Sequence, residues 1–203
     1  MAKVKICGIT DLDDALFAVK SGTDFLGFVF AKSPRRISPL MARKIIQKLP
    51  KKIKKVGVFV DENPRKVNAI VKFCKLDLVQ LHGDEPPEQL RKIRAKTIKA
   101  IRIKGKKDID GAKKYKKAFA VLLDTYVKGL KGGTGKTFDW NIAKEIQKLG
   151  LKVFLSGGIS PKNAKKAVLT VKPFAVDSSS GVERLPGKKD LKKVRALIKA
   201  VKG

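Results

Sequence analysis

The chain repeats one pattern from end to end: a short apolar run, then a stretch in which apolar residues recur at helical spacing. The apolar runs lack a strict alternation of polar and apolar side chains, which is typical of parallel strands buried on both faces. Eight such strands are predicted, at residues 4–9, 25–30, 55–60, 76–81, 98–103, 120–124, 152–156 and 174–177. Strands that alternate with helices in this way favour a (β/α)8 barrel.

The predicted helices begin and end at residues suited to those positions. A capping side chain, in three cases followed by proline, precedes the helical spacing at Ser38-Pro39, Asn63-Pro64, Ser160-Pro161, Asp139 and Asp190. Gly22 and Gly150 follow two predicted helix ends, where a left-handed residue is common. Connections are short and no linker divides the chain, so one α/β domain over residues 1–203 is expected.

An open, doubly wound sheet is the alternative architecture. It usually has fewer strands and carries a glycine-rich turn of the form G-x-G-x-x-G after its first strand. Here the corresponding segment reads Cys7-Gly8-Ile9-Thr10-Asp11, which lacks that pattern. The sequence therefore favours the single-domain TIM barrel, in which active sites lie at the C-terminal ends of the strands.

The chain carries 48 lysine and arginine residues against 18 acidic ones, a formal net charge of +30. Three explanations compete: nucleic-acid binding, attraction of an anionic small substrate, and solvated helix faces in a thermophilic protein. The lysines fall between the apolar positions of helices along the whole chain. Only 6% of residues are aromatic, so a base-stacking surface is poorly supplied. The pattern favours the last two explanations, without a specific nucleic-acid partner.

Other features of the sequence limit the cellular location and the cofactors that we expect. The sequence has no run of eighteen apolar residues and no signal-peptide core, so we expect neither a membrane span nor a secretion signal. Cys7 and Cys74 are too few for a disulfide framework, which indicates the reducing cytoplasm. No cluster has metal-ligand spacing, and we expect neither a metal nor another cofactor.

A glycine-rich segment, Gly132-Gly133-Thr134-Gly135-Lys136-Thr137, resembles a nucleotide-binding P-loop. That motif requires a glycine five residues before the glycine of Gly-Lys-Thr, and this position is Leu130. The spacing therefore fails. We interpret residues 126–137 as a loop over the barrel mouth that can close over a substrate.

Chemically reactive side chains stand at the predicted strand ends. They are Cys7 at the end of the first strand, Arg35 and Arg36 after the second, Gln80 and His82 at the end of the fourth and Asp124 at the end of the sixth. A thiol base and a carboxylic acid could move protons on a sugar phosphate without a cofactor. Structural roles stay open: Cys7 as a small buried residue, the lone His82 in packing, and Asp124 as a helix cap.

The last two predicted strands run into small polar residues. The seventh is followed by Ser156-Gly157-Gly158, and the eighth by Ser178-Ser179-Ser180-Gly181. In a (β/α)8 barrel the loops after strands seven and eight frequently bind phosphate, and backbone N–H groups serve this purpose. Ordinary turns are the alternative, because glycine and serine are common there. Two such segments in this order favour a substrate that carries a phosphate.

Several segments together carry a resemblance that covers essentially the whole chain. They are Lys5-Ile6-Cys7-Gly8-Ile9-Thr10, Ser33-Pro34-Arg35, Gln80-Leu81-His82-Gly83, Leu123-Asp124-Thr125, Gly132-Gly133-Thr134-Gly135, Phe138-Asp139-Trp140, Ser156-Gly157-Gly158 and Asp177-Ser178-Ser179-Ser180-Gly181-Val182-Glu183. With them the chain closely resembles the phosphoribosylanthranilate isomerase family of tryptophan biosynthesis. The resemblance implies a (β/α)8 barrel and the Amadori rearrangement of N-(5-phosphoribosyl)anthranilate. Ser178 is a departure, because the family more often has an apolar residue there.

The resemblance also implies roles for individual residues. Asp124 is the expected general acid, and Cys7 is the expected base in its thiolate form, which a nearby cation would favour. Arg35 is the expected partner of the anthranilate carboxylate, with Arg36 as a rival. Substrate binding is also expected of Gln80 and His82, and phosphate binding of Gly157, Gly158, Asp177, Ser179 and Ser180.

Two other functions stay open at this point. One is the related sugar-phosphate isomerase of histidine biosynthesis. That family has a pair of aspartates at the catalytic positions, whereas this chain has Cys7 at the first of them, on the first strand. The other is a basic nucleic-acid-binding module. The sequence does not determine the oligomeric state, and a homodimer is one possibility. The high lysine content and the short loops favour a thermophilic source.

Overall fold

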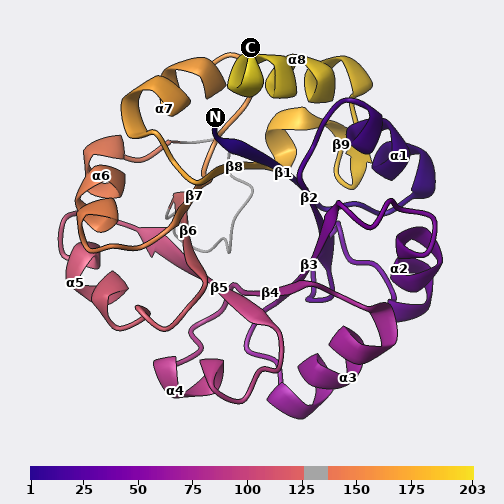
Figure 1. Ribbon diagram of the computed structural model, residues 1–203, viewed down its shortest axis with the longest axis horizontal. Coiled ribbons are helices and arrows are strands. Elements are labelled where there is room, and N and C mark those ends of the chain that lie inside the picture. The colour runs from indigo at the N-terminus through magenta and orange to yellow at the C-terminus, as the bar shows by residue number, and fades with distance from the viewer. Residues whose placement is uncertain (126–136) are drawn as a thin grey trace.

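The computed structural model describes residues 1–125 and 137–203. The segment 126–136, with most of the glycine-rich loop and its expected closure, lies outside the described residues. Parallel strands close into a barrel in sequence order, and β1 pairs with both β2 and β8 (Figure 1). The strands are β1 Lys3–Cys7, β2 Phe25–Val29, β3 Lys54–Phe59, β4 Leu78–Leu81, β5 Lys96–Ile103, β6 Ala120–Thr125, β7 Val153–Leu155 and β8 Ala175–Ser178. The predicted (β/α)8 barrel is confirmed.

Helices form a ring outside the strands (Figure 1). They are α1 Leu12–Lys20, α2 Pro39–Ile46, α3 Pro64–Cys74, α4 Pro87–Leu90, α5 Asp108–Lys113, α6 Trp140–Lys148, α7 Ala164–Val171 and α8 Leu191–Lys202. Ser38, Asn63, Asp139 and Asp190 each accept a hydrogen bond from a backbone N–H in the first turn, as their positions predict. Gly22 and Gly150 have positive φ just after their helices, also as predicted.

The predicted helix start at Ser160-Pro161 is wrong by three residues, because α7 begins at Ala164. Asn163 explains the difference. Its Oδ1 accepts a hydrogen bond from the Ser160 N–H, and its Nδ2 donates to the carbonyl of Gly158. The side chain therefore stabilises a turn between β7 and α7, in the loop that carries Gly157 and Gly158.

The barrel interior changes character along its axis. Val4 and Ile6 of β1 pack outward in the main core beneath the helices, so Lys5 and Cys7 face inward. An apolar cluster fills the N-terminal part of the interior and includes Phe25 and Phe154, whose ring centroids are 5.2 Å apart in an edge-to-face contact. Polar inward-facing residues are thereby left to the C-terminal part.

A short antiparallel hairpin, β9 Glu183–Leu185 with β10 Lys188–Lys189, follows one 3-10 turn between β8 and α8. No strand was predicted in this segment. Figure 1 places it beside α1 and α8, outside the barrel strands. Within the ranges 1–125 and 137–203, no helix is long and apolar enough to cross a membrane.

Candidate active site

A cavity of about 760 Å³ opens at the C-terminal ends of the strands. Its lining includes every residue that the sequence proposed for the site: Cys7, Arg35, Gln80, His82, Asp124, Gly157, Gly158, Asp177, Ser179 and Ser180. Cys7 reaches it from β1 and Asp124 from β6, strands that are not neighbours in the barrel. The fold therefore brings a thiol and a carboxyl group to one cavity from positions 117 residues apart (124 minus 7).

The surroundings of Cys7 are built by three strands. Lys5, one inward-facing position earlier on β1, is fully buried, and its Nζ lies 2.8 Å from Oδ1 of Asp177 on β8. On β2, Gly27 leaves the space that the sulfur occupies, because a Cβ at this position would come within 2.6 Å of Sγ. The thiol is thus held in a tight, largely buried position beside a buried ion pair.

Burial raises the pKa of the Cys7 thiol above its ordinary value of 9.0. The ammonium groups of Lys5 and Lys189 oppose this rise, whereas the carboxylate of Asp177 adds to it. The raised pKa favours the neutral thiol in the free protein, so the two lysines offset the effect of burial only in part. The desolvation of a buried anion outweighs the attraction of the two lysines.

Asp124 faces two other polar side chains in the cavity wall. Its Oδ1 accepts a hydrogen bond of 2.9 Å from the Thr125 N–H, and its Oδ2 lies 3.4 Å from Nε2 of His82. Nδ1 of His82 lies 2.7 Å from Nε2 of Gln80, so with the amide donating, the imidazole proton resides on Nε2.

Two buried atoms of this wall have no hydrogen-bond partner within the described residues. They are Oε1 of Gln80 and Nε2 of His82, whose position beside Asp124 lacks hydrogen-bond geometry. Buried polar groups are normally hydrogen-bonded, and unpaired ones mark a place for an unseen partner. Gln80 and His82 therefore offer an acceptor and a donor to a ligand in the cavity.

The loops after β7 and β8 are locked together at close range. Gly157 and Gly158 both have positive φ, at 77° and 69°. A Cβ at Gly181 would lie 2.1 Å from the carbonyl oxygen of Ile159, so only glycine permits this approach. Ser178 Oγ donates to the same carbonyl at 2.7 Å. The polar side chain at 178, the departure from the family pattern, thus joins the two loops.

Within the described residues, the backbone N–H groups of Gly157, Gly158, Ser179 and Ser180 donate to no other protein group. Unpaired N–H groups that line a cavity suit an anion with several acceptor oxygens. The side chains nearby are engaged elsewhere. Ser179 Oγ donates to the carbonyl of Cys7, and Oδ2 of Asp177 accepts from Ser156 Oγ at 3.2 Å. The loops therefore present mainly their backbones.

The two neighbouring arginines differ in their surroundings. The guanidinium of Arg35 is ion-paired with Glu183 at 2.7 Å and its side chain is 16% exposed. Arg36 is exposed, although it also lines the cavity. Arg35 is thus the arginine whose orientation the fold fixes.

Four residues of the site were missed as functional candidates, or noted only as neighbours of other residues: Lys5, Gly27, Glu183 and Lys189. The position of Lys5 beside Cys7 could have been predicted from the sequence, because residues two positions apart on a strand lie on the same face. Glu183 ends the segment that carries the family resemblance. No sequence pattern could have predicted the roles of Gly27 and Lys189, because these depend on contacts with Cys7 across 20 and 182 residues of sequence.

The fold and this cavity define a (β/α)8-barrel enzyme with a thiol and a carboxyl group at its mouth and two loops of unpaired backbone N–H groups. No group of three or more metal-ligating side chains occurs among the described residues. The family model for N-(5'-phosphoribosyl)anthranilate (PRA) isomerase matches residues 4–200. The chain belongs to this family of isomerases.

Individual relatives agree with this assignment over their full lengths. An N-(5'-phosphoribosyl)anthranilate isomerase from Geobacter sulfurreducens is 50% identical, with all of both chains covered. The crystal structure of phosphoribosyl anthranilate isomerase from Thermotoga maritima has a TM-score of 0.94 and 47% identity, again with both chains fully covered. The Thermus thermophilus isomerase has a TM-score of 0.89 and 40% identity over 98% of each chain. The Thermotoga and Thermus relatives fit the thermophilic character that the lysine content favours.

One further structure shows an isomerase of this family with a bound ligand. It is a complex with reduced 1-(o-carboxyphenylamino)-1-deoxyribulose 5-phosphate, and the fold matches this chain with a TM-score of 0.91 at 46% identity, with both chains fully covered. Another solved structure, at the same TM-score and identity, is of monomers generated from the dimeric Thermotoga maritima isomerase.

Proposed function

We propose that this chain catalyses the Amadori rearrangement of N-(5'-phosphoribosyl)anthranilate to 1-(2-carboxyphenylamino)-1-deoxyribulose 5-phosphate, a step of tryptophan biosynthesis. The observation that carries the proposal is that Cys7 and Asp124 line one cavity together with the two loops of unpaired N–H groups. The ligand named for the related complex carries a carboxylate at one end and a phosphate at the other, which matches the two anion-binding regions of this cavity.

Asp124 acts as the general acid and Cys7 as the general base. The carboxyl group of Asp124 gives its proton to the ribose ring oxygen, the bond from this oxygen to C1 breaks, and the nitrogen lone pair forms a protonated Schiff base. The thiolate of Cys7 then removes the proton from C2, and the electron pair moves to the nitrogen to give an enolamine. Tautomerisation of the enolamine yields the ketone, so the reaction is an isomerisation without net gain or loss of atoms.

The remaining residues hold the substrate in place. The N–H groups of Gly157, Gly158, Ser179 and Ser180 receive the phosphate, and Asp177 supports this region through its ion pair with Lys5. At the opposite end Arg35 pairs with the anthranilate carboxylate. Gln80 and His82 direct their unpaired polar atoms to the sugar between the two ends. Fixing both ends of the substrate presents C2 to Cys7 in a defined geometry.

The direct test is the decay of fluorescence when the protein is added to freshly prepared phosphoribosylanthranilate. We expect a decay whose rate is proportional to protein concentration. An unchanged signal, with turnover of the corresponding aminoaldose of histidine biosynthesis instead, would favour the alternative isomerase. RNA binding that persists at physiological salt with sequence preference would favour the nucleic-acid-binding alternative.

A homodimer and a cytoplasmic location are part of the proposal. A solved structure of the Thermotoga maritima relative is described as derived from a dimeric enzyme, which supports a dimer here. Both cysteines, Cys7 and Cys74, are free and buried, which suits a reducing compartment. Sedimentation equilibrium at micromolar concentration tests the dimer, and a mass near the 22.3 kDa of one chain would contradict it.

A further inference from the structure

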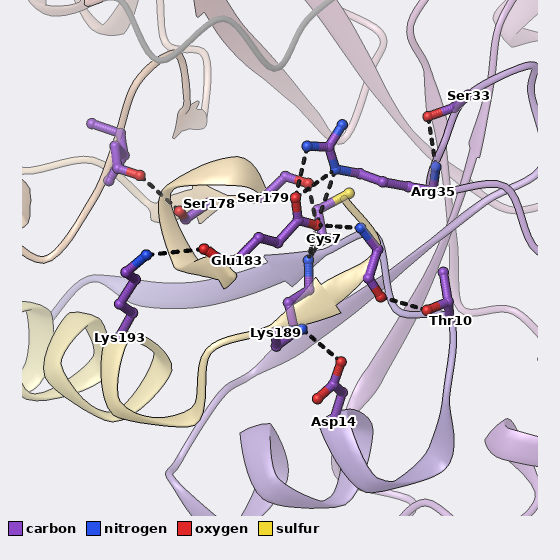
Figure 2. A network of polar contacts seen from close by, with 12 residues as sticks. Cys7, Thr10, Asp14, Ser33, Arg35, Ser178, Ser179, Glu183, Lys189 and Lys193 are labelled. Carbon is purple, nitrogen blue, oxygen red and sulfur yellow. Dashed lines mark hydrogen bonds and ion pairs between the residues drawn. The ribbon is translucent and has the colours of Figure 1, made fainter. Parts of the chain in front are cut away.

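The guanidinium of Arg35 is held along one edge by a carboxylate from the hairpin. Nε of Arg35 lies 3.0 Å from both carboxylate oxygens of Glu183, and Nη2 lies 2.7 Å from Oε2 (Figure 2). Within the described residues Nη1 makes no hydrogen bond, and the side chain lines the cavity. A guanidinium has five N–H groups, so the Nη1 side remains available for one more planar acceptor.

Glu183 is fixed in this position by a second cation. Lys189, from the other strand of the hairpin, has a fully buried side chain, and its Nζ lies 2.7 Å from Oε1 of Glu183. The same Nζ donates to the carbonyl of Cys7, and the N–H of Gly187 reaches Oε1 at 3.3 Å (Figure 2). If Glu183 moved away, Lys189 would be left buried without its counter-charge, which is strongly unfavourable. Lys189 therefore keeps Glu183 in its position beside Arg35.

The charges of this cluster leave a surplus of one. Burial would raise the pKa of Glu183, but Arg35 and Lys189 outweigh it and hold the pKa below its ordinary value, so the residue is an anion at neutral pH. Burial lowers the pKa of Lys189, and Glu183 opposes this effect. With Lys189 protonated, two cations and one carboxylate sum to a single positive charge. Lys189 is enclosed, so this charge is exposed to the cavity on the free edge of Arg35.

We propose that Glu183 is a positioning residue that determines specificity at the Arg35 end of the cavity. It turns one edge of Arg35 to the substrate and cancels part of the positive charge, which lowers the affinity for a dianionic phosphate more than that for a planar monoanionic carboxylate. This inference rests on the proposed function, in which Arg35 binds the anthranilate carboxylate.

The selection matters because the proposed substrate is anionic at both ends. Arg35 and the loops of β7 and β8 line the same cavity, so a reversed substrate would find an anion site at each end. Reversal would remove C2 from Cys7 and leave the substrate bound unproductively. Placing a carboxylate beside Arg35 penalises the phosphate more than the carboxylate, because the repulsion grows with the charge of the ligand.

The test compares Glu183→Gln with Glu62→Gln. Both variants remove one negative charge at the barrel mouth: Glu183 contacts Arg35, whereas Glu62 lines the cavity, pairs with Lys66 and does not contact Arg35. Two equilibrium dissociation constants are measured for each protein, together with kcat and KM: that of anthranilate, and that of a second equivalent of inorganic phosphate, which binds after the loops of β7 and β8 are saturated. For Glu183→Gln we expect the ratio of the phosphate constant to the anthranilate constant to fall about tenfold, with KM rising more than kcat falls. Glu62→Gln should leave the ratio within about twofold of the parent's.

An unchanged ratio in Glu183→Gln, or an equal change in both variants, would overturn the inference. Glu183→Asp covers the case in which the glutamine variant does not fold: it keeps the charge but shortens the reach, so the ratio should stay while KM rises. The binding constants need no turnover. If the parent protein fails to convert phosphoribosylanthranilate, the proposed function fails, whereas the ratio still decides the role of Glu183.

Discussion

The proposed chemistry depends on two side-chain groups, the thiol of Cys7 and the carboxyl group of Asp124. Both face inward at strand ends, and both are almost completely buried. Their positions at the ends of predicted strands allowed them to be identified from the sequence, because the C-terminal ends of parallel strands meet at one rim of a barrel. The pKa of Cys7 was not predictable in this way, since it depends on how tightly Gly27 and the other strands enclose the sulfur.

We expect Cys7→Ala and Asp124→Asn each to lower kcat by about 10²–10⁴-fold, because each removes one proton-transfer group. The fluorescence assay measures the loss, and circular dichroism checks that the fold is intact. Cys74→Ala is the matched control: Cys74 is the other buried cysteine, and its Sγ contacts the carbonyl of Pro39 away from the cavity. Turnover near the parent level in either site variant would contradict the assigned roles.

The raised pKa of Cys7 predicts how the rate depends on pH. Below this pKa, which lies above 9.0, the reactive thiolate is a minor form whose fraction grows about tenfold per pH unit. We therefore expect kcat/KM to increase continuously from pH 7 to pH 9 while the protein remains folded. A profile that is flat over this interval would show that the thiol is already ionised in the reacting state.

At the scale of elements, the barrel strands were predictable and the hairpin was not. The eight strand segments are short, mainly apolar runs, and this pattern locates each strand although individual boundaries differ by one or two residues. Strands β9 and β10 contain three and two residues and are rich in charge, so no periodicity marks them. Glu183 meets Arg35 across 148 residues of sequence, a pairing that no local pattern encodes.

The loops after β7 and β8 form a unit because Ser178 bridges them. In Ser178→Ala the carbonyl of Ile159 loses this donor, and we expect a loss of about 1 kcal/mol in the free energy of unfolding. Looser phosphate-binding loops should raise KM more than they lower kcat, as measured by steady-state kinetics and thermal unfolding. Ser160→Ala, in the same loop, is the control and should change neither. An unaltered KM in Ser178→Ala would mean that the loops hold their geometry without this bond.

At the scale of the whole molecule, the formal net charge of +30 creates a field that attracts anions. We expect kcat/KM to decrease as sodium chloride rises from about 20 mM to about 500 mM, because the screening length falls severalfold over this range. The value of kcat, which does not include the encounter, should change much less. Stopped-flow or steady-state measurements at constant pH provide the test. A kcat/KM that is independent of salt would show that the charge does not attract the substrate, and the lysines would then serve only to solvate the helix faces.

The pairing of β1 with β8 has a consequence for synthesis. The surroundings of Cys7 include Asp177 through Lys5, the hydroxyl of Ser179 and the ammonium of Lys189, all supplied more than 160 residues later. A nascent chain that has left the ribosome up to α7 holds the thiol and the carboxyl group but none of these neighbours. Until β8 pairs with β1, we expect the sulfur to be more accessible than in the folded protein. Enzyme activity should begin only when the C-terminal residues have packed against the N-terminal strand.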